Sequence, residues 1–385
     1  KDGQLEIIAQ ILKSKQTLGL LPTGGGKSLC FHLTASLYQG CCIIFCPIIA
    51  LMKDQVAELS SMGFSQRITE ISSQQSIEEK RQVMEKINSG KMQFVFVSPE
   101  RVQRQDFRDL LKGLSVGSVV VDEAHCLSEW GHDFRLPYLT LAPSIKKFMP
   151  RTPIICLTAT ASLPVLRDIQ AEFELTDDEV VYKMDNSREE LGFNVLSPAY
   201  RGEVDFKVRN LAEEKEPALN NLISELQTKG WVSEEAAGII FTPHVNGKLS
   251  CYNVQRQLSR TFTDLKTGLF SGDKPKDYIP VDEDTKKKFG SHPANETFTK
   301  IKFAYQERFK KNELAVMCVT KSFGMGINKP NTRFTVHYAM PTSMEALYQE
   351  GGRAGRDGKN AECYVLFTKS EVDIPEWIHH ESTDV

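Results

Sequence analysis

The stretch that decides the fold is Leu18-Gly19-Leu20-Leu21-Pro22-Thr23-Gly24-Gly25-Gly26-Lys27-Ser28, an apolar run that passes through a glycine-rich turn into a helical pattern. Glycines let backbone N–H groups converge on phosphate oxygens, and the N-terminus of the following helix adds partial positive charge. In this context Lys27 is expected to reach the β- and γ-phosphates, and Ser28 to give a hydroxyl to Mg²⁺. The sequence therefore predicts an ATP site built on Thr23, Gly24, Gly25, Gly26, Lys27 and Ser28.

A second apolar run, Ser118–Asp122, ends in two carboxylates and continues as Ala124-His125. Ligands of parallel α/β sheets bind at the carboxyl ends of the strands, so Asp122 is expected beside the phosphate loop, as a Mg²⁺ ligand through water. Glu123 is then placed to orient and deprotonate the attacking water. The spacing therefore predicts a catalytic set of Lys27, Asp122 and Glu123. It also predicts two metal ligands, Ser28 and Asp122.

The rest of the chain alternates short β-branched runs with longer helical patterns, which is typical of parallel sheets covered by helices. One set of expected strands precedes residue 178 and a second set follows it. The first set is Thr17–Leu21, Cys41–Cys46, Phe94–Ser98, Ser118–Asp122 and Ile154–Thr158. The second set is Val180–Met184, Gly238–Thr242, Lys266–Phe270, Leu314–Val319, Phe334–His337 and Ala361–Phe367. We therefore expect two α/β lobes, 1–178 and 179–385.

Composition excludes some classes of protein. The 385 residues carry a formal net charge of −3, so charge gives no support for nucleic-acid binding. No apolar run approaches the roughly 20 residues that a membrane-spanning helix needs, and we expect no membrane partner. The N-terminus shows no signal peptide, so the expected compartment is cytosolic. Nine cysteines without a Cys-x-x-Cys pair are expected to be buried and reduced, and a zinc site is not expected.

Residues 272–298 break the alternation, with little apolar content and the run Lys286-Lys287-Lys288. This stretch is expected to be a long loop, and loops of this length are functional or disordered. Two interpretations stay open: a mobile insertion, or a contact with nucleic acid or a partner through the lysines.

Several further motifs resemble those of superfamily 2 helicases, and specifically of the RecQ family. The resemblance covers nearly the whole chain, with Gln4 at the position of the family's adenine-reading glutamine. The similar segments are Pro47–Val56 (motif Ia), Val97–Arg101 (Ib), Leu157–Ala161 (III), Gly238–Thr242 (IV), Val319–Pro330 (V) and Gln349–Gly358 (VI). This family has two tandem RecA-like lobes, each a parallel sheet flanked by helices, with ATP in the cleft between them.

The segment most specific to the family is Cys126–Arg135, which is similar to the RecQ aromatic-rich loop. Trp130 and Phe134 offer faces on which bases stack, worth roughly 1–3 kcal/mol per base. The alternative is that both are core aromatics, but the polar run around them favours an exposed loop. The chain has Glu129 where the family usually has Gln, and Leu136-Pro137 where it has Pro directly after the arginine. It also has Asn328 in motif V where the family normally has Asp.

The resemblance implies roles for further residues. Arg353 and Arg356 are expected to cross the cleft to the γ-phosphate and to stabilise charge in the transition state. Gln4 and Gln349 join the nucleotide-binding set. The residues expected to contact DNA are Lys53, Ser98, Arg101, Trp130, His132, Phe134, Arg135 and Thr320.

The expected function is that of an ATP-dependent DNA helicase that moves 3′-to-5′ on single-stranded DNA and opens tailed duplex. The expected cofactors are ATP and Mg²⁺, and the expected location is cytoplasmic (nucleoid-associated) or nuclear. The alternatives are a DNA-stimulated translocase that remodels protein–DNA complexes without efficient unwinding, a catalytically silent nucleic-acid-binding scaffold, and an RNA motor. Because the zinc and winged-helix domains of many relatives do not follow the second lobe, we expect a motor region of a larger protein.

Overall fold

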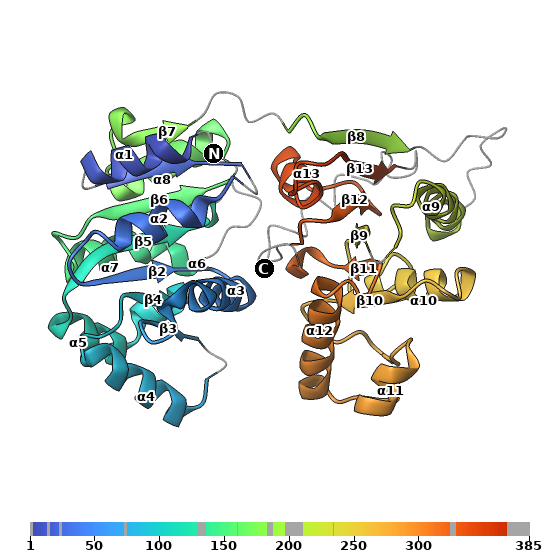
Figure 1. Cartoon of the computed structure of the whole chain (residues 1–385), viewed down its shortest axis with the longest axis horizontal. Helices are drawn as coiled ribbons and strands as arrows, with labels where there is room; N and C mark the ends of the chain where they lie inside the picture. Colours follow the sequence, from blue (N-terminus) through green and yellow to red (C-terminus); the bar gives the residue numbers. More distant parts are fainter. Residues whose placement is uncertain are drawn as a thin grey trace. The chain divides into compact units, whose positions relative to one another are not determined.

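The computed structural model describes residues 3–13, 16–22, 25–72, 75–128, 136–159, 161–182, 188–196, 211–233, 235–323 and 329–367. The chain divides into two compact units, the first ending at residue 187 and the second beginning at Arg188. Each unit contains a parallel β-sheet with helices packed against it (Figure 1). The predicted α/β fold with two tandem lobes is therefore confirmed.

The sheet of the first unit has seven strands among the described residues, in the order β3-β4-β2-β5-β6-β1-β7, and every pair is parallel. The strands are β1 (Gln16–Leu20), β2 (Cys41–Phe45), β3 (Ile68–Ile71), β4 (Phe94–Val97), β5 (Val116–Asp122), β6 (Ile154–Thr158) and β7 (Val180–Tyr182). The helices are α1 (Gln4–Lys13), α2 (Lys27–Ala35), α3 (Ile49–Leu59), α4 (Ile77–Asn88), α5 (Gln105–Gly113), α6 (Leu136–Leu139), α7 (Leu141–Phe148) and α8 (Leu163–Phe173).

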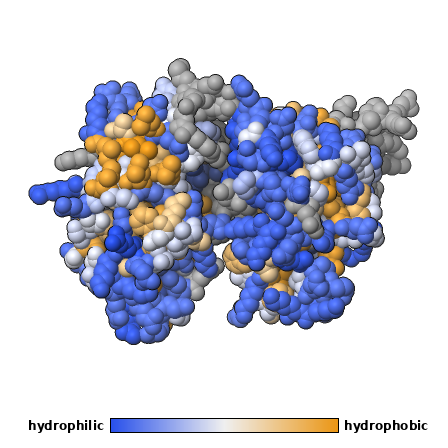
Figure 2. All heavy atoms as spheres, viewed as in Figure 1, coloured by the Kyte–Doolittle hydropathy of each residue, from blue (hydrophilic) through white to orange (hydrophobic). Residues whose placement is uncertain are grey.

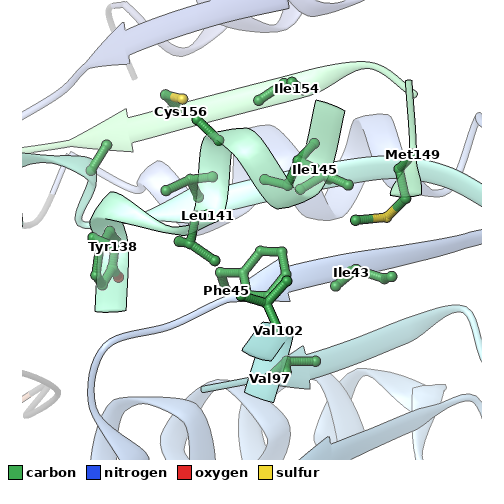
Figure 3. Packing of buried hydrophobic residues seen from close by; sticks show 14 of the residues in the cluster. Ile43, Phe45, Val97, Val102, Tyr138, Leu141, Ile145, Met149, Ile154 and Cys156 are labelled. Atoms are coloured by element: carbon green, nitrogen blue, oxygen red, sulfur yellow. The ribbon is translucent and has the colours of Figure 1, made fainter. Parts of the chain in front are cut away.

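Hydrophobic clusters cover both faces of this sheet, which explains why its strands read as continuous apolar runs. In β2, Ile43 and Phe45 point into one cluster while Cys42 and Ile44 point into the other. The first cluster is closed by α5, α7 and α8, and the second by α1, α2 and α3. Figure 3 shows Leu141 and Ile145 of α7 facing the strand residues of the first cluster.

In this region one strand was predicted in the wrong lobe, and another was missed. Val180–Tyr182, expected in the second lobe, pairs in parallel with β1 and forms an edge of the first sheet. The predicted boundary between 178 and 179 therefore lies too early, because this strand belongs to the first unit. Strand β3 was missed, since Ile68 and Ile71 are its only buried residues and Thr69 and Glu70 between them are polar.

The sheet of the second unit has six strands among the described residues, in the order β10-β11-β9-β12-β13-β8, all parallel. The strands are β8 (Leu191–Leu196), β9 (Ala237–Phe241), β10 (Thr267–Phe270), β11 (Val316–Val319), β12 (Thr332–His337) and β13 (Ala361–Leu366). The helices are α9 (Leu211–Thr228), α10 (Cys251–Thr261), α11 (Glu283–Phe289), α12 (Asn295–Lys310) and α13 (Met344–Gly351). Strand β8 was not predicted, because it is an edge strand with only one buried residue, Leu191.

The expected long loop at 272–298 is instead a structured insertion. It holds α11 and the start of α12, and Figure 1 shows α11 beside α12, which lies next to β10. Asp282 caps α11 and also accepts hydrogen bonds from Tyr305 (2.5 Å) and Arg308 (3.0 Å) of α12. On the other side, the Tyr252 hydroxyl bonds the backbone of Ile279. The insertion is therefore fastened to two helices, and the prediction that 272–298 is a long loop was wrong.

All nine cysteines are buried and free, as predicted. In the described ranges no group of three or more His, Cys, Asp or Glu side chains is placed to hold a metal ion. The tail residues His379 and His380 lie outside those ranges. The helices that the structure describes include none with the length and apolarity to span a membrane.

Most of the surface visible in Figure 2 is hydrophilic, with an apolar area over α1 and α2. These two helices pack against each other and leave four leucines 48–73% exposed, Leu5, Leu12, Leu29 and Leu33, and Leu37 just after α2 is also exposed. Part of the apolar content of this unit therefore lies on its surface, next to the phosphate loop.

Candidate nucleotide-binding site

The phosphate loop joins β1 to α2, in the context that the sequence predicted. Gly26 precedes the first residue of α2, Lys27, and has φ +81°, a conformation that side chains rarely adopt. A Cβ atom on Gly25 would lie 2.8 Å from the carbonyl oxygen of Pro22. The loop therefore needs glycine at both positions, while Thr23 and Gly24 lie outside the described residues. Ser28 follows Lys27 in the first turn of α2.

Gln4 of α1 contacts this loop. Its side chain is only 8% exposed, and Nε2 donates a hydrogen bond to the carbonyl oxygen of Gly26 at 3.0 Å. A Cβ atom on Gly26 would lie 2.3 Å from the same Nε2. The close packing of Gln4 on Gly26 brings the proposed adenine-reading residue to the phosphate loop.

Asp122 ends β5 and is 3% exposed. Its carboxylate accepts hydrogen bonds from Gln55 Nε2 (3.1 Å) and from the backbone N–H of Glu123 (3.0 Å). Burial, and then the neighbouring Glu123, raise the pKa of Asp122 to about 6, against the lowering effects of Lys27 and Gln55. A buried carboxylate whose ionised form is disfavoured would be stabilised by a bound cation.

Lys27 and Glu123 meet although the sequence separates them widely. Lys27 Nζ lies 3.0 Å from Glu123 Oε1, and the two side chains are 14% and 12% exposed. Glu123 has φ 49° and ψ 50°, in the left-handed region that non-glycine residues rarely occupy. Such backbone strain persists where the surrounding structure holds it, often at functional sites. The turn after β5 thus aims the Glu123 carboxylate at the lysine of the phosphate loop.

His125 connects the acidic pair to the strand beside it. The ring is 1% exposed, and Nδ1 lies 2.9 Å from Thr158 Oγ1 and 3.4 Å from Glu123 Oε2. Thr158 ends β6 and belongs to the predicted motif III, of which Thr160 lies outside the described residues. A change in the contacts of Glu123 can therefore reach the neighbouring strand end through a single side chain.

Two residues of this site were not assigned a role from the sequence. Gln55 of α3 bonds the Asp122 carboxylate, and the Tyr138 hydroxyl of α6 donates to the Asp122 carbonyl at 2.8 Å. Gln55 stands in the predicted motif Ia, and its polar side chain on a largely buried helix face was the available signal. Tyr138 offered no such signal, because a buried tyrosine is ordinary in a core.

The predicted arginines lie in the second unit, directly after α13. Arg353 is 4% exposed and Arg356 is half-buried, and Gln349 of α13 is 7% exposed. Glu350 of the same helix lies 3.1 Å from Nδ1 of His337, which ends β12. Burial lowers the pKa of His337, but Cys363 and Glu350 outweigh it and raise that pKa to about 9. The segment that carries the arginines is therefore anchored to the sheet by a buried ion pair.

Among the residues expected to contact DNA, three follow strands at the carboxyl ends of the sheets. Ser98 follows β4 and is 9% exposed, while Arg101 is buried and its guanidinium pairs with Asp106 at 3.0 Å. Thr320 follows β11, and its hydroxyl lies 2.8 Å from Ser322 Oγ. Lys53 is exposed on α3. The other four, Trp130, His132, Phe134 and Arg135, lie outside the described residues. The DNA contacts of all eight remain predictions.

Two family models match the chain. The DEAD/DEAH box helicase family matches residues 1–169, and the helicase conserved C-terminal domain matches residues 295–358. The first match contains the phosphate loop and the acidic pair. The second contains the α13 segment and both arginines.

Curated relatives match over nearly the whole chain. The ATP-dependent DNA helicase RecQ of Bacillus subtilis is 31% identical over 383 residues, which is 99% of this chain and 56% of the relative. The probable ATP-dependent DNA helicase RecS of the same organism is 32% identical over 381 residues, covering 98% of this chain and 66% of the relative. The chain thus spans between about half and two thirds of the length of these relatives.

Solved structures share the fold. The DEAD-box helicase Mss116, bound to ssRNA and UDP-BeF, superimposes with a TM-score of 0.71 over 98% of this chain and 72% of that one, at 17% identity. The family models, the full-length matches and the phosphate-loop geometry agree with one another. This chain belongs to the RecQ-like helicases of superfamily 2 and corresponds to their helicase core.

Proposed function

We propose that the chain is the motor of an ATP-dependent DNA helicase, which couples ATP hydrolysis to movement on single-stranded DNA and to opening of duplex. The observation that carries the proposal is the convergence of Lys27, Glu123 and Asp122 at the phosphate loop. Relatives named as ATP-dependent DNA helicases match over nearly the entire chain, which supports DNA as the track. The proposal implies that the protein acts in a compartment that contains DNA, either the cytoplasm or the nucleus.

In the proposed reaction, ATP binds with its phosphates at the backbone N–H groups of the loop and at Lys27. The Lys27 ammonium group, which pairs with Glu123 in the structure, then binds the phosphates instead. Glu123 is freed to accept a proton from the water that attacks the γ-phosphate. Gln4, which already bonds the phosphate loop, would read the adenine edge and favour ATP over GTP.

Mg²⁺ fits the chemistry of this site. Ser28 and Asp122 supply oxygen ligands, the type that this ion prefers. The buried Asp122 carboxylate has a raised pKa, which a divalent cation would offset. When bound, the ion would neutralise charge that develops on the phosphate oxygens.

Arg353 and Arg356 are proposed to act on the same nucleotide. Guanidinium groups stabilise the transition state of phosphoryl transfer, and their loss costs roughly 10³–10⁵-fold in turnover in related systems. Placing them on a different unit from Lys27 would make hydrolysis depend on how the two units move. The direction of travel, 3′-to-5′, is proposed from the family resemblance.

A second candidate uses the same chemistry. The chain would be a DNA-stimulated translocase that remodels protein–DNA complexes without efficient unwinding. Because the chain spans at most about two thirds of the matched relatives, the unwinding activity of a whole relative does not follow for it.

The deciding experiment measures ATP hydrolysis with and without single-stranded DNA, for the chain and for Glu123→Gln. Strand separation is followed in the same samples on duplexes with 3′ or 5′ tails. DNA-stimulated turnover that Glu123→Gln abolishes, together with opening of the 3′-tailed duplex, is the expected result. Stimulated turnover with closed duplex supports the translocase. Turnover that DNA leaves unchanged contradicts both candidates.

A further inference from the structure

We propose that Arg188 is a positioning residue for the arginine loop, the segment 352–356 that carries Arg353 and Arg356. This inference rests on the proposed role of those two arginines in ATP hydrolysis. Arg188 is the first residue of the second unit, and it lies far from the arginine loop in sequence. None of the motifs in the sequence includes it.

The contacts of Arg188 flank Arg353 on both sides. Its Nη1 donates a hydrogen bond to the carbonyl oxygen of Gly352 at 3.0 Å, and Nη2 donates to that of Ala354 at 2.7 Å. A guanidinium is a rigid planar fork, so two bonds from one group fix the separation and the direction of both carbonyls. Arg188 therefore sets the backbone conformation on either side of Arg353.

The guanidinium is itself held in place. Arg188 is 11% exposed, and its Nε donates to the carboxylate of Glu190. The backbone carbonyl of Glu190 accepts a hydrogen bond from the Ala361 N–H, where β13 begins to pair with β8. The position of Arg188 is thus fixed by the sheet rather than by a surface loop.

The arginine loop has little freedom of its own. Gly355 has φ +67°, and its N–H donates to the carbonyl oxygen of Thr332 at 2.9 Å. A Cβ atom on Gly355 would lie 3.1 Å from the carbonyl oxygen of Lys359 and 3.3 Å from Cγ of Glu190. The loop packs directly on the Arg188–Glu190 pair, so a change at Arg188 reaches Arg353 and Arg356 through one layer of contacts.

The test measures kcat and KM for ATP in the presence of single-stranded DNA. It compares Arg188→Met, Arg188→Lys, the double variant Arg353→Ala/Arg356→Ala, and the triple variant that adds Arg188→Met to that pair. Small misplacement of catalytic groups costs up to about 100-fold in rate, so kcat of Arg188→Met is expected to fall roughly 10- to 100-fold, with KM for ATP within about twofold. Arg188→Lys should recover part of the rate, because an ammonium group reaches one carbonyl but not both in fixed geometry. In the Arg353→Ala/Arg356→Ala background, Arg188→Met should lower kcat little further, because neither arginine is left to position.

Lys215→Met is the matched control for a purely structural loss. Lys215 is fully buried in the same unit and donates to the carbonyl oxygens of Tyr338 and Leu366, neither of which belongs to the arginine loop. The inference is overturned if Arg188→Met lowers kcat no more than Lys215→Met at equal loss of thermal stability. It is also overturned if Arg188→Met lowers kcat by the same factor in the Arg353→Ala/Arg356→Ala background as in the unaltered chain. If Arg353→Ala/Arg356→Ala hydrolyses ATP at the normal rate, the role of these arginines in the proposed function is wrong, and this inference fails with it.

Discussion

Lys27 Nζ and Glu123 Oε1 lie 3.0 Å apart in a largely buried ion pair that joins the phosphate loop to the end of β5. Glu123 reaches this position because its backbone takes the left-handed conformation directly after the strand. The same geometry places its other carboxylate oxygen 3.4 Å from Nδ1 of His125. The proposed base therefore contacts both the phosphate-binding residue and the residue that leads to motif III.

Replacing Glu123 with Gln should separate ATP binding from hydrolysis. The neutral amide cannot accept the water proton, and general-base removal costs about 10²–10⁴-fold in rate. ATP should bind at least as tightly as before, because Lys27 loses a competing anion. Equilibrium titration with a fluorescent ATP analogue and single-turnover hydrolysis measure the two steps.

The matched control is Glu174→Gln, which changes an exposed glutamate that also has a positive φ, of 57°. It should leave both steps unchanged. Normal hydrolysis in Glu123→Gln would show that another residue activates the water.

Asp122→Asn should stabilise the first unit while abolishing hydrolysis. The pKa of Asp122 is raised from 3.8 to about 6, so stability that is present below pH 4 is lost as the pH rises through about 6. An amide avoids this loss, but its single oxygen keeps only one of the two hydrogen bonds from Gln55 and the Glu123 N–H. The free energy of unfolding should therefore rise by about 1–2 kcal/mol at pH 8. Thermal unfolding at pH 4 and pH 8 measures it. The gain should vanish at pH 4, and an equal gain at both pH values would contradict the assignment to Asp122.

As a control for that measurement, Asp109→Asn changes an exposed aspartate of the same unit. Its effect on the free energy of unfolding should be small at either pH, because an exposed carboxylate and its surface ion pair contribute little to stability.

Gln4→Leu should weaken ATP binding and its preference over GTP. Losing one or two hydrogen bonds costs about 0.5–1.5 kcal/mol each, so KM for ATP should rise roughly 10-fold. Gln10→Leu is the control on the same helix, since Gln10 instead bonds the carbonyl oxygen of Asp178 at 3.0 Å. Steady-state kinetics with both nucleotides decide the matter. If the ratio of KM for GTP to KM for ATP is unchanged in Gln4→Leu, Gln4 only supports the Gly26 turn.

Asp282→Ala should loosen the insertion that carries α11. The variant loses a helix cap and the bonds from Tyr305 and Arg308, at a cost of about 2–4 kcal/mol. Burial alone would raise the pKa of Asp282, but the bonds from Tyr305 and Thr285 lower it below 3.8. The stabilisation is therefore present above pH 3.8 and is lost as the pH falls through the lower folded pKa.

Hydrogen exchange of residues 272–294 at pH 7 measures this loosening directly. Asp284→Ala, an exposed change in the first turn of the same helix, should alter exchange little. Equal protection in Asp282→Ala and the unaltered chain would show that the aromatic contacts of Tyr278 hold the insertion by themselves.

Features that depend on neighbouring residues were predicted from the sequence, and features that depend on contacts between distant residues were not. Strands β2, β4, β5 and β6 were predicted within two residues, because burial on both faces leaves a continuous apolar run. Strands β3 and β8 were missed, since these two edge strands bury only two residues and one residue respectively and leave no such run. The insertion was read as a loop because its order depends on hydrogen bonds from Asp282 and Tyr252 to partners elsewhere in the chain.

The sequence by itself determined the phosphate loop, the acidic pair and the two-lobe α/β fold, because each depends on local spacing. Glycine permits the turn before Lys27, and strand ends place Asp122 and Glu123 at the carboxyl edge of a parallel sheet. Only the tertiary structure decided that Lys27 pairs with Glu123, that Gln55 and Tyr138 hold Asp122, and that Arg188 holds the backbone around Arg353. These contacts join residues far apart in the chain, and the directional geometry of a hydrogen bond leaves no periodic trace in a sequence.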